Sequence, residues 1–558
     1  MNLAAFSLQP TALDSIDAKA TPLPSFRPFD KLFRLTPARI KRLYVIVQVS
    51  TKQRLDAGLR RHDGFSPLVV LAIVFAVASS CATVTHSPVS EKRPTTIGLT
   101  SCTLAKHKEA ALCGKHQVYE NRAAQTGRKI ALNIVVLPAR SSPTKADPVF
   151  YLAGGPGQAA ARIASAGEDA IMRELRHERD LVFIDMRGTG DSNGLQCSFP
   201  IDRADVQNFF LELFDPVKVQ ACSEKLEQSA DLRYYTTPLG IEDLEEIRSA
   251  LGYDQINLYG ISYGSLAALE YVRRYSDHVR SAVLAGVAAP AAKLPLQLVL
   301  AAQQAMTRLF HDCAADVVCA SAFPNLTGSF GRILDGFKPG MVNFAVAHPV
   351  SKAIQTVSLS RGVFARQVVS LLYSHRTASL LPLIIDSAAK GDWSPYVRVL
   401  TRSAAAPEFG VFLGAYFSAT CAESIPFIDE SELEHASAGT FLGDFRARRH
   451  QQPCAYWPRG AIDSEFHSPV RADAPVLMLS GDIDPSTPAE FGAQVLQSLP
   501  NGRQVILRST PHSFASPCAR DQIVAFITNG SAKKLDANCA ARLRRPPFAT
   551  ELPARYNR

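Results

Sequence analysis

Recognisable metal-ligand spacing is absent from this chain of 558 residues. None of its 11 cysteines forms a CxxC pair, and no cluster among its 13 histidines accompanies them. Zinc sites need such spacings, because ligands from short segments must converge on one ion. The sequence therefore predicts no metal site, and we expect no cofactor.

Positive charge is scarce outside the N-terminal segment. The formal net charge is +9, but residues 1–80 contain 11 Lys or Arg and 5 Asp, so they hold +6 and the remainder only +3. No basic run interleaved with aromatic residues occurs. Binding to nucleic acid requires a basic face, so we do not expect nucleic acid as a partner.

The apolar run Pro67 to Ala78 is too short for the ~20 residues of a membrane-spanning helix. Three arginines (Arg54, Arg60 and Arg61) precede it, and Ala78-Ser79-Ser80-Cys81 follows it. This order of a basic region, a hydrophobic core and small residues is typical of a secretory signal. We expect residues 1–80 to be an N-terminal extension with this signal, and residues 1–50 to reflect a start codon assigned too early.

The cysteine directly after the small residues resembles that of a bacterial lipoprotein signal. That resemblance implies that Cys81 is lipidated and becomes the mature N-terminus, which would attach the protein to a membrane. Soluble secretion is the alternative. In either case we expect export, to the periplasm or the cell envelope.

The other ten cysteines are even in number, as disulfide bonds in an oxidising compartment require. Pairing of sequence neighbours would give Cys102–Cys113, Cys197–Cys222, Cys313–Cys319, Cys421–Cys454 and Cys518–Cys539. The spacing alone leaves this connectivity open.

Short apolar runs alternate with helical stretches along most of the chain. Strands are expected at 129–137, 148–152, 180–185, 256–259 and 280–284, and near Val476 and Val505. This alternation predicts an α/β fold with a mostly parallel sheet covered by helices on both faces. Helical spacing of apolar residues in 294–310 and 363–385 predicts an inserted helical cap. The expected domains are 1–80, a first core part 81–290, the cap 291–418 and a C-terminal core part 419–558.

Gly260-Ile261-Ser262-Tyr263-Gly264 follows an expected strand and precedes a helix-forming stretch. A serine hydroxyl becomes an effective nucleophile when a sharp strand-to-helix turn, bounded by small residues, presents it to a base. We interpret this segment as a nucleophile elbow with Ser262 as the catalytic serine.

The acid and the base of such a site are expected later in the chain, each after a further strand. The run ending at Leu479 leads into Ser480-Gly481-Asp482-Ile483-Asp484-Pro485, which offers two carboxylates. His512 follows the run 504–507 and is the only histidine beyond Asp484. We therefore predict His512 as the base, with Asp482 and Asp484 competing as the acid.

Two backbone N–H donors must stabilise the oxyanion of the intermediate, one of them from the residue after the serine. Tyr263 would supply this first donor. The loop Ala153-Gly154-Gly155-Pro156-Gly157 follows an earlier strand, and its glycines let backbone amides approach a substrate oxygen. We predict that Gly155 supplies the second.

These elements in this order resemble a branch of the α/β-hydrolases, the serine exopeptidase family of prolyl aminopeptidase and tripeptidyl aminopeptidase. The segment from Pro290 to about Ser418 matches nothing specific in that family. The resemblance is carried by Gly154 to Gly157, Asp185 to Ser192, Asp243 to Gly252, Gly260 to Gly264, Leu284 to Val287, Asp484 to Pro488, and His512 with Cys518.

The resemblance implies an α/β-hydrolase fold, with Ser262 as nucleophile, Asp484 rather than Asp482 as the orienting acid, and His512 as general base and acid. Three positions depart from the family. Ala153 stands where prolyl aminopeptidases commonly have histidine, which puts the strictly prolyl subgroup in doubt. Ala285 replaces an aspartate and Pro511 a glycine, at positions that should carry no chemistry.

An aminopeptidase must recognise a free α-ammonium, which calls for a carboxylate at a fixed distance from the serine. Glu423, in a segment that resembles the family's cysteine-and-acid segment, is the candidate. A solvated surface glutamate is the alternative there. We expect an exported serine exopeptidase acting on peptides with free N-termini, and a carboxylesterase or lipase with the same triad as the alternative.

Overall fold

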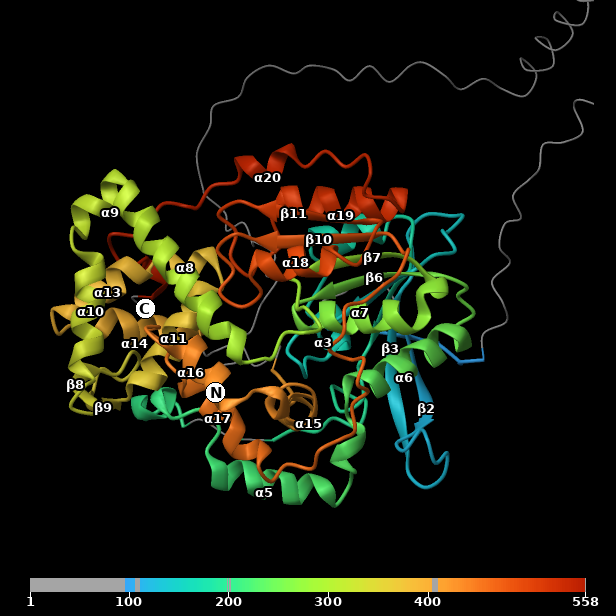
Figure 1. Ribbon diagram of the computed structural model, residues 1–558, viewed down its shortest axis with the longest axis horizontal. Coiled ribbons are helices and arrows are strands. Elements are labelled where there is room, and N and C mark those ends of the chain that lie inside the picture. The colour runs from blue at the N-terminus through green and yellow to red at the C-terminus, as the bar shows by residue number, and fades with distance from the viewer. Residues whose placement is uncertain (1–95, 106–110, 198, 200–201, 404–409, 557–558) are drawn as a thin grey trace, which may run out of the picture. The chain divides into compact units, whose positions relative to one another are not determined.

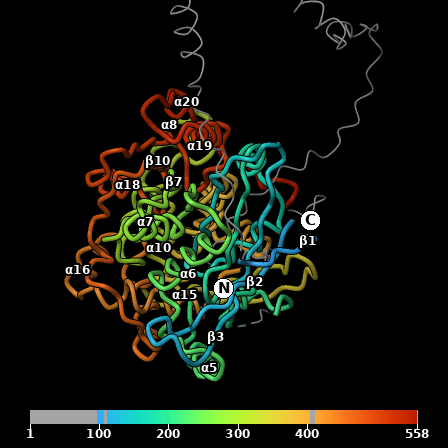
Figure 2. Tube along the Cα trace, turned by 90° about the vertical axis from the view of Figure 1, so that its right-hand side faces the viewer, coloured from blue at the N-terminus to red at the C-terminus, as the bar shows by residue number. Residues whose placement is uncertain are grey.

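The computed structural model describes residues 96–105, 111–197, 199, 202–403 and 410–556. The predicted signal and Cys81 lie outside the described residues. Within them a nine-stranded sheet has the order β1-β2-β3-β5-β4-β6-β7-β10-β11, and its two ends lie on opposite sides in Figure 2. The strands are β1 (Thr100–Cys102), β2 (Ala111–Tyr119), β3 (Lys129–Leu137), β4 (Val149–Leu152), β5 (Leu181–Ile184), β6 (Ile256–Ile261), β7 (Val279–Ala285), β10 (Val476–Gly481) and β11 (Gly502–Leu507).

The predicted strands are all present, and the sheet is parallel from β5 to β11. The antiparallel end comes from β1 and β2, which the sequence interpretation missed, pairing onto β3. β2 was missed because its buried positions are few and its remaining side chains are partly exposed or exposed.

The central strands are buried on both faces, as parallel strands between two helical layers must be. In β4, Phe150 and Leu152 enter one hydrophobic cluster with α6 and α7, whereas Tyr151 enters another with α3, α4 and α19. This α/β layering matches the predicted fold class. The helices outside the cap are α3 (Ala160–Ser165), α4 (Ala170–Leu175), α5 (Pro216–Glu227), α6 (Thr237–Ala250), α7 (Tyr263–Tyr275), α15 (Leu413–Glu423), α16 (Glu430–Ser437), α17 (Phe445–Cys454), α18 (Ala489–Leu496), α19 (Pro517–Asn529) and α20 (Asn538–Arg542).

The cap has its own hydrophobic cluster and gathers to the left of the sheet in Figure 1. It is not wholly helical as expected, because the hairpin of β8 (Val342–Ala347) and β9 (Ile354–Leu359) is part of it. The helix α15 also crosses the boundary expected at residue 418. The cap helices are α8 (Leu296–Ala315), α9 (Val317–Ala322), α10 (Leu326–Gly336), α11 (Arg361–Leu372), α12 (His375–Ala378), α13 (Leu381–Ala389) and α14 (Ser394–Ser403).

No single helix of the described residues has the length and apolarity needed to cross a membrane. The bent pair Arg361–Leu372 and His375–Ala389 passes that test of length and composition only when its two parts are taken together.

Five disulfide bonds join sequence neighbours, and they confirm the predicted pairing in full. Disulfide bonds in this number are typical of proteins that fold in an oxidising compartment outside the cytosol. One of them, Cys421–Cys454, joins α15 to α17 across a separation of 33 residues. Both of these helices carry residues that line the site described below.

Candidate active site

Ser262 occupies the turn between β6 and α7, with φ 57° and ψ −125°. A non-glycine residue rarely adopts a positive φ, and such strain is concentrated at functional sites. Its N–H donates to the Ala285 carbonyl at 2.9 Å, which fixes the turn against β7. The flanking glycines are sterically required: a Cβ on Gly260 would lie 2.2 Å from the Gly264 oxygen, and one on Gly264 would lie 2.1 Å from the Leu152 oxygen. This is the geometry of a nucleophile elbow.

Asp484 and His512 form a buried pair in the loops that follow β10 and β11. The Nδ1 atom of His512 lies 2.6 Å from Oδ2 of Asp484. The other carboxylate oxygen of Asp484 accepts from the N–H groups of Ser486 (2.8 Å) and Thr487 (2.9 Å). Because a carboxylate only accepts, Nδ1 carries the proton and Nε2 is left with a lone pair to act as base.

Asp482 does not contact His512. Its Oδ1 atom accepts from the Thr510 N–H at 3.3 Å, and burial raises the pKa of the carboxyl. Of the two competing carboxylates, only Asp484 is therefore placed to orient the imidazole.

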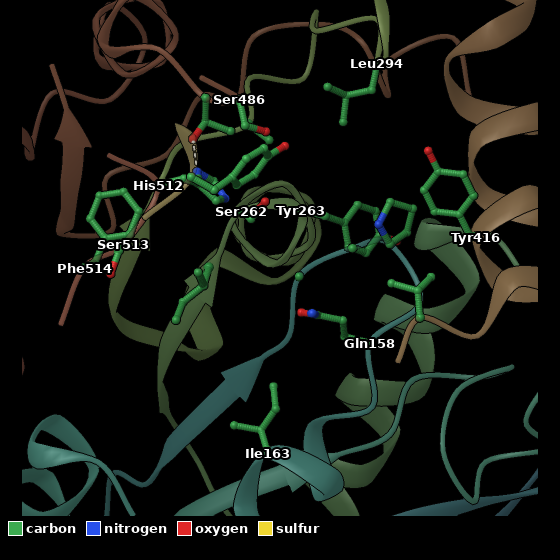
Figure 3. Close-up of a pocket in the computed structure, with 18 of the residues that line it drawn as sticks. Gln158, Ile163, Ser262, Tyr263, Leu294, Tyr416, Ser486, His512, Ser513 and Phe514 are labelled. Carbon is green, nitrogen blue, oxygen red and sulfur yellow. Dashed lines mark hydrogen bonds between the residues drawn. The ribbon is translucent and has the colours of Figure 1, made fainter. Parts of the chain in front are cut away.

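Ser262 and His512 line one cavity of about 140 Å³. Figure 3 shows them side by side, with Ser486, Ser513 and Phe514 nearby. The cap supplies one wall of this cavity through Leu298, Arg366 and Tyr373. The Tyr373 ring meets the His512 ring edge to face, with their centroids 5.2 Å apart, so the cap reaches the predicted base.

The glycine loop passes directly behind the nucleophile. A Cβ on Gly154 would lie 3.3 Å from Cβ of Ser262, and Gly155 has a φ of 115° that favours glycine. Gly155 and Tyr263 both line the cavity. The structure therefore brings both predicted oxyanion donors to the site, and the roles of their N–H groups remain a prediction.

Two further residues support the catalytic pair. The Thr487 hydroxyl lies 2.8 Å from Oδ2 of Asp484 and 3.0 Å from Nδ1 of His512. Gly286 adopts a φ of 67°, and a Cβ there would lie 3.0 Å from Cε1 of His512. A threonine three residues after an aspartate is a common turn signal, so Thr487 could have been found from sequence, whereas the contact of Gly286 depends on the sheet order.

Glu423, the predicted ammonium anchor, does not reach the cavity wall. It is buried at the end of α15, and its carboxylate accepts from the Thr237 N–H (2.6 Å) and the Thr237 hydroxyl (2.8 Å). That hydroxyl in turn hydrogen bonds to Tyr263, which stands at the cavity. Burial raises the pKa of Glu423 to about 8. All residues of α15 are buried, which excludes the alternative of a solvated surface glutamate.

Asp169 is the one carboxylate among the described residues that line the cavity. Its Oδ1 atom accepts from the Met172 N–H and caps α4, whereas its buried Oδ2 atom has no hydrogen-bond partner. Burial raises the pKa of this carboxyl. Sequence reasoning missed Asp169 because it lies in a loop without a motif.

The fold and the site together define a serine hydrolase with an α/β-hydrolase core. Comparisons with known proteins agree. The family described as "alpha/beta hydrolase fold" matches residues 147–322, and the family described as "TAP-like protein" matches residues 439–539. These matches and the relatives below support an α/β-hydrolase peptidase family for the chain.

Named relatives align with most of the chain. Serine protease Hip1 of Mycobacterium tuberculosis is 23% identical over 471 residues, which cover 77% of this chain and 87% of that protein. Tripeptidyl aminopeptidase of Streptomyces lividans is 22% identical over 73% of this chain and 78% of its own length. Carboxylesterase B of Mycobacterium tuberculosis is 24% identical over 69% of this chain and 78% of its own length.

Proposed function

We propose that this protein is an exported serine exopeptidase that releases amino acids or short peptides from free N-termini. The observation that supports this most directly is that Ser262 and His512 line the same cavity, where His512 is hydrogen bonded to Asp484. The names of two relatives, a serine protease and a tripeptidyl aminopeptidase, favour peptides as the substrate class.

In the proposed reaction, Nε2 of His512 takes the proton from Ser262 as the serine oxygen attacks the peptide carbonyl carbon. The oxyanion that forms would accept from the N–H groups of Tyr263 and Gly155. Collapse of this intermediate breaks the C–N bond, and His512 gives the proton to the departing amine. Water then repeats the sequence on the acyl-enzyme and restores the free serine.

An exopeptidase must hold the substrate ammonium close to the serine, and the placement of carboxylates favours Asp169 over Glu423 for this role. Asp169 lines the cavity and has an unpaired oxygen, while both oxygens of Glu423 are bound by Thr237. An ammonium beside Asp169 would supply the missing partner. Asp169→Asn keeps an oxygen to cap α4, so it removes charge with little change in fold.

Hydrolysis of a matched set of anilides tests the proposal: aminoacyl, tripeptidyl and N-acetylated tripeptidyl, beside short-chain acyl esters. We expect cleavage of free but not of N-acetylated peptides, and a KM for free peptides raised by Asp169→Asn with ester turnover retained. Equal turnover of free and acetylated peptides would contradict the exopeptidase assignment.

A carboxylesterase remains the second candidate, because the cavity lining is rich in apolar side chains such as Ile163, Leu298 and Phe514 and one relative is named a carboxylesterase. Turnover of esters with no cleavage of any anilide would favour it.

For location, we propose that Cys81 anchors the protein to the cell envelope through a lipid. Mass spectrometry of the mature N-terminus tests this, with a lipid-modified Cys81 expected. An unmodified N-terminus would favour soluble secretion.

A further inference from the structure

Two buried arginines from different helices line the catalytic cavity. Arg366 lies on the cap helix α11 and is 6% exposed, and Arg446 lies on α17 and is 7% exposed. Arginine is seldom buried without a partner, because removing a guanidinium from water is costly unless an anion compensates.

The other buried arginines of the described residues follow that rule. Each has a carboxylate in salt-bridge contact: Arg176 with Glu168, Arg179 with Asp147 (2.8 Å), Arg187 with Asp243 (2.7 Å) and Arg248 with Glu245 (2.6 Å).

Arg366 and Arg446 depart from it. No carboxylate of the described residues lies within 4.0 Å of either guanidinium, and the Nε atom of each is buried without a hydrogen-bond partner. The carboxylate that acts on Arg366 from farther away is Glu212, which contacts Arg449 (3.3 Å) and accepts from the Ser360 hydroxyl (2.7 Å). Two cations in the cavity wall therefore have no carboxylate in contact with them in the part of the chain that the structure describes.

The Arg446 guanidinium is close enough to Arg366 for its charge to lower the pKa of Arg366. Burial is the main cause that lowers the pKa of Arg366 to about 10, and the charge of Arg446 contributes in the same direction. Arg366 nevertheless remains cationic at neutral pH. An anion placed between two such groups would relieve both their mutual repulsion and their desolvation.

Hydrogen bonds and a disulfide hold the backbone of Arg446 in place. Nδ1 of the buried His450 lies 2.6 Å from the Arg446 carbonyl oxygen, and Nε2 lies 2.6 Å from the Tyr416 hydroxyl. A carbonyl only accepts, so Nδ1 carries the proton and the Tyr416 hydroxyl donates to Nε2. The Cys421–Cys454 disulfide joins the two helices that carry Tyr416 and Arg446. Such positioning suits a binding group more than a side chain left over from packing.

We propose that Arg366 and Arg446 form a subsite that binds a carboxylate of the substrate, and that the enzyme therefore prefers peptides with an acidic group near the scissile bond. Guanidinium groups match carboxylates through paired N–H donors, and desolvation in the cavity strengthens the contact. The carboxylate would be either an acidic side chain or the C-terminus of a short peptide. The inference rests on the proposed function in so far as the substrate is a peptide.

Competition against covalent labelling of Ser262 tests the subsite without requiring peptide hydrolysis. Four tripeptides are compared as protectants against a fluorophosphonate: Ala-Ala-Glu and Ala-Ala-Gln, each with a free and an amidated C-terminus. We expect the peptide that has the bound carboxylate to protect at a concentration at least about 10-fold lower than its amide counterpart. This factor corresponds to the free energy of hydrogen bonds to a charged group. A difference between the Glu and Gln peptides would assign binding to the side-chain carboxylate, and a difference between free and amidated peptides would assign it to the C-terminus.

For each variant, protection is measured relative to the rate at which that variant is labelled without peptide. In the double variant Arg366→Met and Arg446→Met, the four half-protecting concentrations should lie within about 2-fold of one another. The double variant with lysine at both positions should retain part of the preference. Arg308→Met is the matched control, because Arg308 lies in the cap, pairs with Asp312 and does not line the cavity. It should keep the wild-type preference.

Equal protection by all four peptides in the wild-type protein would overturn the subsite, as would a preference that survives in the double methionine variant. Failure of the proposed function is a separate result, because it is read from the turnover of anilides rather than from labelling.

Discussion

Thr487 bridges the acid and the base of the triad through one hydroxyl, which lies within 3.0 Å of both Asp484 and His512. Removing a hydrogen bond to a charged group costs about 1.5–3 kcal/mol. We expect Thr487→Val to lower kcat about 10- to 100-fold with little change in KM, because the hydroxyl acts on the catalytic pair and not on bound substrate. Steady-state kinetics on an ester and an anilide measure this. Unchanged kcat would assign the hydroxyl to folding of the loop alone.

Glu423 should make stability depend on pH. Its pKa is raised to about 8 in the folded protein, against an ordinary value of 4.5. Between these values the folded state keeps a proton that the unfolded state loses, so this group lowers stability as pH rises from about 4.5 to about 8. In Glu423→Gln the amide can still hydrogen bond to Thr237. We expect the melting temperature of this variant to exceed that of the wild-type protein by more at pH 8 than at pH 5.

Thermal melting at both pH values checks that expectation. An equal difference at pH 5 and pH 8 would mean that Glu423 is ionised in the folded protein. The same variant also tests the earlier role predicted for this residue, because an ammonium anchor would lose kcat/KM on free peptides when its charge is removed.

The helices α15 and α17 hold one side of the cavity, and the Cys421–Cys454 disulfide joins them. Closing a loop of this size stabilises a protein by about 2–4 kcal/mol. We expect Cys421→Ala with Cys454→Ala to lower the free energy of unfolding by that amount and to weaken the preference for acidic peptides more than ester turnover. Denaturant unfolding and the labelling competition measure the two effects. Loss of stability with an unchanged preference would show that α17 is held by packing alone.

For strands, helices and loops, the sequence was most informative about the elements whose local geometry the function constrains. The elbow at Ser262, the loop of Asp484, the position of His512 and the parallel strands that carry them were predicted, because each needs a strand end followed by residues with a distinctive turn chemistry. The β8–β9 hairpin and β2 were not predicted, since their exposed faces leave a weak apolar pattern. Arg366, Tyr373 and Arg446 reach the cavity through tertiary packing, which no local motif records.

The buried charges of Arg366 and Arg446 at the cavity should lower the stability of the whole molecule. Burial of a cation without a paired anion costs free energy, so an apolar side chain of similar size in its place should be neutral or stabilising. Breaking a buried pair instead costs about 3–5 kcal/mol. We therefore expect Arg366→Met to keep or raise the melting temperature. We expect Arg187→Met to lower it, because this change removes the buried one of the two arginines that pair with Asp243 and leaves only Arg122. Calorimetry of both variants measures this. A marked loss of stability in Arg366→Met would show that its charge serves the fold.

In the proposed reaction Ser262 carries the N-terminal part of a peptide as an acyl-enzyme, and rapid quenching can trap this intermediate. A free tripeptidyl anilide is mixed with the enzyme, quenched in acid, and the protein is mapped by mass spectrometry. We expect a peptidyl adduct on Ser262, whose mass gives the number of residues released, and no adduct in Ser262→Ala. An adduct on another residue, or anilide turnover that persists in Ser262→Ala, would contradict the proposed reaction.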